Sequence, residues 1–123
     1  MRSTRSLREL GNGPVQPRPT LPMPCDPRAV DVALGILRDP ACRFTLEEWA
    51  DAVGASPSTL RRAFLTETSL TFSEWRARAR LDAALPLLAD GMTSEQVALQ
   101  VGYASRSGFV EAYRRHFGHP PAR

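Results

Sequence analysis

The sequence has no lysine, so all 16 of its basic side chains are arginines. Its two cysteines, Cys25 and Cys42, stand far apart without a CxxC pair or Cys/His cluster, so neither a disulfide nor a metal site is expected. It has no glycine-rich phosphate loop and no nucleophile–base set, which argues against an enzyme and gives no sign of a cofactor. No apolar run approaches the ~18 residues of a membrane span, and no secretory signal follows the N-terminal arginines. The cytoplasm is therefore the expected location.

Charge is distributed unevenly along the chain. The net charge of +3 comes entirely from residues 1–25, which hold four arginines and one glutamate. Residues 26–53 hold three arginines and six acidic residues, whereas residues 102–118 hold three arginines and one glutamate. We therefore expect an acidic outer side and a basic side suited to DNA.

Residues 1–25 differ in composition from the rest of the chain. They contain five prolines and two glycines, which predicts an extended arm or linker without a core of its own. Such a segment would touch phosphate groups, lead to an upstream domain, or form a passive tail, and its composition leaves these alternatives open. Residues 26–123 are enough for one domain with a modest core.

Residues 93–118 predict a helix-turn-helix. Thr93 and Gln96 form a capping box that begins a first helix, and Gly102 stands where the chain must turn. Ser105 can cap a second helix over 106–117. Helical periodicity divides that second helix into two faces. We expect one face to pack against a core through Phe109, Ala112, Tyr113 and His116. The other face would point outward with Arg106, Ser107, Val110, Glu111 and Arg114.

The same pattern occurs once upstream, over residues 45–64. Ala50 and Gly54 match Ala98 and Gly102 at a shift of 48 residues. Three further matches fall at a shift of 49, because the second turn has one extra residue: Ser56 with Ser105, Leu60 with Phe109, and Phe64 with Tyr113. This internal duplication is stronger evidence than a single helix-turn-helix match.

The first unit, residues 26–70, also contains a preceding helix over 26–38. Asp26 caps it, Pro27 takes its first position, and a buried stripe is expected at Val30, Ala33, Leu34 and Leu37. A helix over 46–53 and one beginning at Pro57 complete the unit. Ser58, Arg61 and Arg62 are expected to point outward from the latter. A solvated arginine pair is the alternative to base-reading arginines.

Between the units, residues 71–90 predict a linker helix that Thr71 and Glu74 begin with a capping box. Residues 72–89 would span roughly 27 Å at 1.5 Å per residue. Two units held in this way would place their recognition helices about one DNA turn apart, ~34 Å. Pro86 predicts a kink near 82–86. Arg76 and Arg80 would touch phosphate or tie the units together, and a structural role is favoured for Arg80.

Together these residues resemble the DNA-binding domain of the AraC/XylS family of bacterial transcription regulators over about 26–121. The resemblance is most specific in three motifs: Arg80-Leu81-x-x-Ala84-x-x-Leu87-Leu88, Val97-Ala98-x-x-Val101-Gly102-Tyr103, and Tyr113-Arg114-Arg115-x-Phe117-Gly118-x-Pro120-Pro121. The first unit adds Leu46-x-x-x-Ala50, Gly54-x-Ser56 and Leu60-x-Arg62-x-Phe64.

The resemblance implies an all-α fold of two helix-turn-helix subdomains joined by a long linker helix, a homeodomain-like tandem. It implies sequence-specific binding of double-stranded promoter DNA, with activation through contact with RNA polymerase. The DNA-contacting positions of the family fall on Ser58, Arg61 and Arg62 in the first unit. In the second unit, residues 91–123, they fall on Arg106, Ser107, Val110 and Glu111.

Three departures from the family pattern stand out. Ser69 replaces a glycine after the first recognition helix, and Glu111 is acidic where Arg62 is basic. The chain also stops at Arg123, before the final aromatic–arginine pair of the family. These ends suggest a piece of a longer regulator with a separate effector or dimerisation domain; a stand-alone member is the competing interpretation. A helical protein-interaction module without DNA binding is the alternative function.

Overall fold

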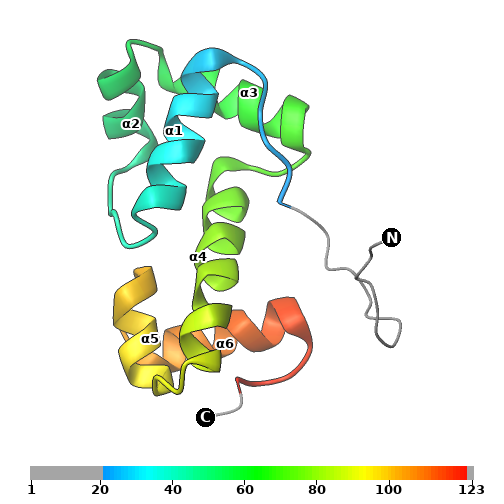
Figure 1. Cartoon of the computed structure of the whole chain (residues 1–123). Coiled ribbons are helices and arrows are strands. Elements are labelled where there is room, and N and C mark those ends of the chain that lie inside the picture. Colours follow the sequence, from blue (N-terminus) through cyan, green and yellow to red (C-terminus); the bar gives the residue numbers. More distant parts are fainter. Residues whose placement is uncertain (1–20, 122–123) are drawn as a thin grey trace, which may run out of the picture.

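The computed structural model describes residues 21–121, which form six α-helices and no strand. One long helix, α4, runs along the middle of the molecule, with α1–α3 packed around one end and α5 and α6 around the other (Figure 1). This confirms the all-α fold with two helix-turn-helix pairs. The helices are α1 Pro27–Arg38, α2 Leu46–Val53, α3 Pro57–Thr68, α4 Phe72–Ala89, α5 Ser94–Val101 and α6 Arg106–Phe117.

The capping residues begin each helix where the sequence predicts. Thr45, Thr71 and Thr93 each accept from the backbone N–H three residues on, and Glu48, Glu74 and Gln96 bond back in return. These reciprocal bonds satisfy amide groups that the first helical turn leaves without intrahelical partners. Asp26, Ser56 and Ser105 cap the remaining three helices. Local chemistry therefore fixes the helix boundaries.

The expected stripe of α1 is wrong by one residue. Ala29, Val32, Ala33 and Ile36 are buried, whereas Leu34 and Leu37 are 38% and 43% exposed. Both stripes are apolar, so periodicity alone does not choose between them. Gly35 accounts for the choice, because a Cβ there would lie 2.6 Å from Cη2 of Trp49, so the close packing of α2 on this face of α1 requires a glycine. Trp49 packs against the core, as expected, but is only half-buried.

Two separate hydrophobic cores meet along α4. In the first, Phe64 makes edge-to-face contacts with Phe72 and Trp75 at centroid distances of 5.6 and 5.5 Å. Ala79 is the last α4 residue of the first core and Leu81 is the first of the second. The second core consists of Leu81, Ala84, Val97, Ala98, Val101, Phe109 and Tyr113.

The C-terminal half of α4 serves the second unit as α1 serves the first. Ala33 and Leu81, and Ile36 and Ala84, are buried equivalents at the same shift of 48 residues that relates Ala50 to Ala98. The internal duplication therefore extends to a third helix, which the sequence comparison missed. Because α4 contributes to both cores, only its C-terminal half corresponds to α1, and this correspondence is hard to detect in the sequence.

Residues 21–25 form no helix but are held on the first unit. The indole Nε1 of Trp75 donates to the carbonyl of Pro22 at 2.6 Å. A single carboxylate oxygen of Glu67 accepts from the backbone N–H groups of Cys25 and Asp26 at 2.7 and 3.0 Å. Most of the proposed arm, residues 1–20, lies outside the described residues.

Two backbone features of the sequence analysis reappear around α4. The helix passes through Pro86 to Ala89 as one element, with Pro86 exposed, so the proline does not end it; the kink stays a prediction. Ser69, just before α4, has φ +64°, and it is the one non-glycine residue with positive φ among residues 21–121. No helix in that range is long and apolar enough to cross a membrane.

Candidate nucleic-acid interface

The turns of the two units have the same local geometry. Gly54 and Gly102 both take left-handed conformations, with φ +72° and +106°, a region in which side-chain-bearing residues are strained. The residue after each glycine donates its N–H to the equivalent alanine carbonyl: Ala55 to Ala50 at 2.9 Å and Tyr103 to Ala98 at 2.8 Å. The two turns therefore begin alike, and the second reaches its capping serine one residue later than the first.

The outward face of α3 matches its prediction. Ser58, Arg61 and Arg62 are exposed, whereas Leu60 and Phe64 on the opposite face are fully buried. Neither arginine side chain makes a hydrogen bond or ion pair with another described residue. The two guanidinium groups are therefore available to an outside acceptor, and the fork of donors on each matches phosphate or a guanine edge.

The outward face of α6 matches in part. Arg106, Ser107, Glu111 and Arg114 are exposed, but Val110 is half-buried and packs against the second core. Its side chain offers only part of its surface to a ligand.

On the opposite face of α6, Phe109 and Tyr113 are buried and Ala112 is half-buried. His116 is exposed, so the expectation that it packs is wrong. It lies in the last turn of α6, where it lines an open cavity beside α4 rather than the core.

Glu111 has a partner that the sequence analysis did not assign. Its carboxylate accepts from Nη2 of Arg115, one helical turn on, at 3.3 Å. Both side chains are largely exposed, at 68% and 73%, so the pair contributes only a few tenths of a kcal/mol. Arg115 would have been found by the i, i+4 spacing of opposite charges.

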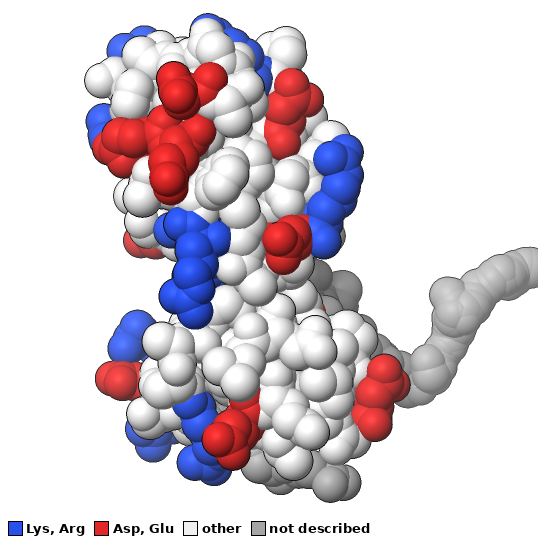
Figure 2. All heavy atoms as spheres, turned by 90° about the vertical axis from the view of Figure 1, so that its left-hand side faces the viewer, with Lys and Arg blue, Asp and Glu red and all other residues white. Residues whose placement is uncertain are grey.

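The recognition helices share an orientation. In Figure 1, α3 and α6 both cross α4 at its ends and run from the left of the view to the right. Figure 2 looks onto that left-hand side. In the upper unit, acidic side chains gather on the left of this view and basic ones lie along its right edge, whereas the lower unit carries side chains of both signs. This face thus mixes both signs, whereas the sequence suggested an acidic side and a basic side.

Two arginines of α4 are held by the protein itself. Arg80 donates from Nε to the carbonyl of Pro40 at 2.8 Å and from Nη2 to that of Cys42 at 3.0 Å, which confirms its structural role. Arg76 donates to the carbonyl of Phe44. Burial lowers the pKa of both guanidinium groups from the ordinary value, and for Arg80 the nearby Arg76 lowers it further.

These features define a class of protein: a tandem helix-turn-helix protein whose two units present arginines and serines from equivalent helices. Comparisons with known proteins agree. A family model described as a helix-turn-helix domain matches residues 49–123. The chain is 42% identical over 104 residues to the transcriptional regulator RipA of Corynebacterium glutamicum, covering 85% of this chain and 31% of RipA. It is 30% identical to the transcriptional regulator NimR of Escherichia coli K12, covering 89% of this chain and 41% of NimR.

Solved structures give the same result. The DNA-binding domain of AdpA, a global transcriptional factor solved in complex with a target DNA, superposes with a TM-score of 0.72 at 27% identity. That match covers 80% of this chain and 88% of the AdpA chain. An AraC-type regulator from Chromobacterium violaceum also gives 0.72, at 25% identity, covering 77% of this chain and 86% of that one. The chain belongs to the AraC-type helix-turn-helix family of transcriptional regulators, and it carries the DNA-binding domain of that family. It spans about a third of the length of RipA.

Proposed function

We propose that this chain binds a specific promoter sequence by inserting α3 and α6 into successive major grooves on one face of a duplex. The observation that carries the proposal is the pair of equivalent turns, each followed by a capped helix with exposed arginines, of which Arg61, Arg62 and Arg106 have no side-chain partner among the described residues. α4 has 18 residues and so spans about 27 Å, which is compatible with the ~34 Å of one DNA turn once the recognition helices flank its ends.

Each recognition residue has a role that follows from its chemistry. Arg61, Arg62 and Arg106 read base edges, since a bidentate arginine contact to guanine gives about 1–3 kcal/mol of discrimination. Arg114 and the hydroxyls of Ser58 and Ser107 contact phosphates and set the register. Val110 contributes an apolar contact limited by its partial burial. Glu111 would accept from a cytosine amino group only after releasing Arg115.

The proposal also includes partners other than DNA, which the family resemblance implies. The protein acts in the cytoplasm as an activator that contacts RNA polymerase, under the control of an effector or dimerisation domain upstream. The alternative is a helical protein-interaction module. It accounts for the six helices, but it gives no reason for two outward faces to share one layout.

A gel-shift titration against salt separates the two functions, with the bound sequence first selected from random DNA. DNA binding predicts that log K falls linearly with log salt, with a slope near −0.9 for each phosphate neutralised. An interaction module predicts no selected sequence and no such slope, and that result would reject the proposal. Arg62→Ala and Arg106→Ala should each flatten base preference in a different half-site, whereas Arg38→Ala, at an exposed arginine of α1, should leave both preferences unchanged.

A further inference from the structure

The two units touch each other at very few places apart from α4. Their cores are separate, and within residues 21–121 none of α1, α2 and α3 packs extensively on α5 or α6. α4 is the main connection between the two units, and a second contact beside it resists bending or twisting of one unit against the other. The relative position of α3 and α6 therefore depends on the groups beside α4 where the two units meet, a region that we call the waist.

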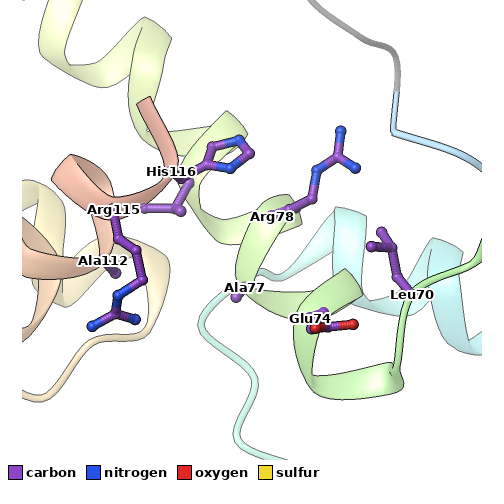
Figure 3. A pocket seen from close by; sticks show the side chains of 8 residues that line it. Leu70, Glu74, Ala77, Arg78, Ala112, Arg115 and His116 are labelled. Atoms are coloured by element: carbon purple, nitrogen blue, oxygen red, sulfur yellow. The ribbon is translucent and has the colours of Figure 1, made fainter. Parts of the chain in front are cut away.

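On one side of α4 the waist is open. A cavity of about 310 Å³ separates the α3–α4 connection from the last turns of α6. Figure 3 shows Glu74 and Arg78 reaching into this region from α4, with Arg115 and His116 coming from α6. No described group bonds the buried Nε of Arg78. Among the described residues, no hydrogen bond or ion pair crosses this cavity from one unit to the other.

On a different side of α4, the side chain of Arg80 fills the space between the two units. Its guanidinium donates to the carbonyls of Pro40 and Cys42, in the loop that joins α1 to α2. Gly102, the turn of the second unit, lies against the same guanidinium. A Cβ on Gly102 would lie 2.8 Å from Nε of Arg80 and 3.1 Å from Cα of Ala41. The first unit, Arg80 and the second unit are thus stacked with no room for a methyl group.

Arg76 provides a natural comparison one helical turn earlier. It also bonds the α1–α2 loop, at the carbonyl of Phe44, and its guanidinium lies 4.9 Å from the centroid of the Phe72 ring. These partners lie in the α1–α2 loop and in the first core. Arg76 and Arg80 thus hold the same loop, but only Arg80 also touches the second unit.

We propose that Arg80 is a positioning residue that fixes the distance and angle between α3 and α6, and so makes the protein selective for the spacing of its two half-sites. This inference rests on the proposed function, because it requires both units to bind one duplex. One added base pair moves a half-site by about 3.4 Å along the axis and turns it by about 35°. Because Arg80 holds the two units in a fixed relative position, they cannot follow that change, and one unit loses its base contacts.

Affinity for DNA with altered half-site spacing tests the proposal. The probes are the selected site, the same site with one base pair added or removed between half-sites, and each half-site alone. The parent should lose about tenfold or more in affinity when the spacing changes, because the contacts of one unit are lost. Arg80→Gln should bind each half-site as the parent does but show less than about a twofold difference between spacings. Arg76→Gln should keep the spacing preference of the parent.

Glycine variants supply a second, independent pair. Gly102→Ala and Gly54→Ala both place a side chain at a positive φ, of +106° and +72°, so the backbone strain is larger at Gly102; a Cβ at Gly54 also meets nothing within 4 Å. Only Gly102→Ala should weaken the spacing preference. If Arg80→Gln and Gly102→Ala are folded and keep the spacing ratio of the parent, or if the Arg76 and Gly54 variants lose it equally, the proposal is wrong.

A measurement without DNA keeps the inference testable if a variant binds poorly. Residual dipolar couplings should fit one alignment tensor for both units in the parent and in Arg76→Gln. They should need two tensors in Arg80→Gln, since the units then reorient separately, and one shared tensor in that variant would overturn the proposal. If neither half-site binds the parent, the proposed function fails, while the dipolar couplings still decide whether Arg80 braces the waist.

Discussion

The two units close their hydrophobic cores with different helices. The first has a helix of its own, α1, to close the core under α2 and α3. The second has no such helix and uses the C-terminal half of α4, through Leu81 and Ala84. The difference shows that α4 is more than a spacer, because it forms part of the second core. The second unit therefore depends on the linker helix for its own stability, whereas the first can lose the end of α4 with less damage.

Removing the central aromatic of each unit should give the largest effect. Phe64 and Phe109 are both 0% exposed, and truncating a buried phenylalanine costs about 3–5 kcal/mol. We expect losses of that size in the free energy of unfolding for Phe64→Ala and Phe109→Ala, measured by urea denaturation. Amide hydrogen exchange should then separate the units, because Phe109→Ala should expose Val97 and Val101 while Leu60 stays protected.

The same exchange experiment can show whether the two units are independent. If either phenylalanine variant lowers protection equally in both units, they form a single cooperative core, and the division at Arg80 has no energetic meaning. Leu65→Ala, in the same helix as Phe64, is a suitable control, since Leu65 is 50% exposed and its truncation should cost far less.

Two helical glycines should respond in opposite ways. A Cβ at Gly35 would lie 2.6 Å from Trp49, so Gly35→Ala should destabilise the first unit by about 1–3 kcal/mol through overpacking. A Cβ at Gly108 meets only Ser105 Oγ, at an ordinary 3.4 Å, so Gly108→Ala should stabilise the second unit by up to about 1 kcal/mol. Thermal unfolding measures both. A stable Gly35→Ala variant would contradict the packing that sets the stripe of α1.

The helix ends after α3 and α6 differ by one side chain. Ser69 has φ +64° and Gly118 has φ +85° in equivalent C-cap positions. Relieving a left-handed non-glycine residue recovers about 1 kcal/mol, part of which the greater freedom of unfolded glycine cancels. Ser69→Gly should therefore raise the free energy of unfolding slightly, and Gly118→Ser should lower it. Matching shifts of the same sign would show that the caps are not equivalent.

The smallest effect concerns charge on the recognition helices. Glu111 is the acidic member of the α6 face, and α3 has no acidic residue at its outward positions. Glu111→Gln should raise DNA affinity about two- to fivefold at low salt, an effect that salt screens. Asp31→Asn makes the same charge change at an exposed position of α1 and should have less effect. Equal gains would mean that only net charge matters.

Much of this fold could be predicted because its signals are local. Side chains at Thr45, Thr71 and Thr93 bond their own helices, so a sequence pattern suffices to place helix starts. The exposed positions of α3 follow from periodicity in the same way. The stripe of α1 could not be predicted, since two apolar stripes compete and only the contact between Gly35 and Trp49 selects one.

Features that depend on distant segments were out of reach of the sequence. Arg80 was expected to be structural, but its contact with Gly102 depends on how the second turn meets the loop at Ala41. Val110 is partly buried because it packs against the second core, and His116 is exposed beside the first half of α4, so both outcomes depend on how other helices pack against α6. In each case spacing along one helix says nothing about the neighbour that decides the outcome.

Footprinting of the selected site by methylation interference tests the central claim most directly. Binding through α3 and α6 predicts two windows of major-groove contact, centred about one helical turn apart on the same face of the duplex. Arg62→Ala should remove base contacts from one window and Arg106→Ala from the other. A single window, two windows on opposite faces, or loss of the same window in both variants would contradict it.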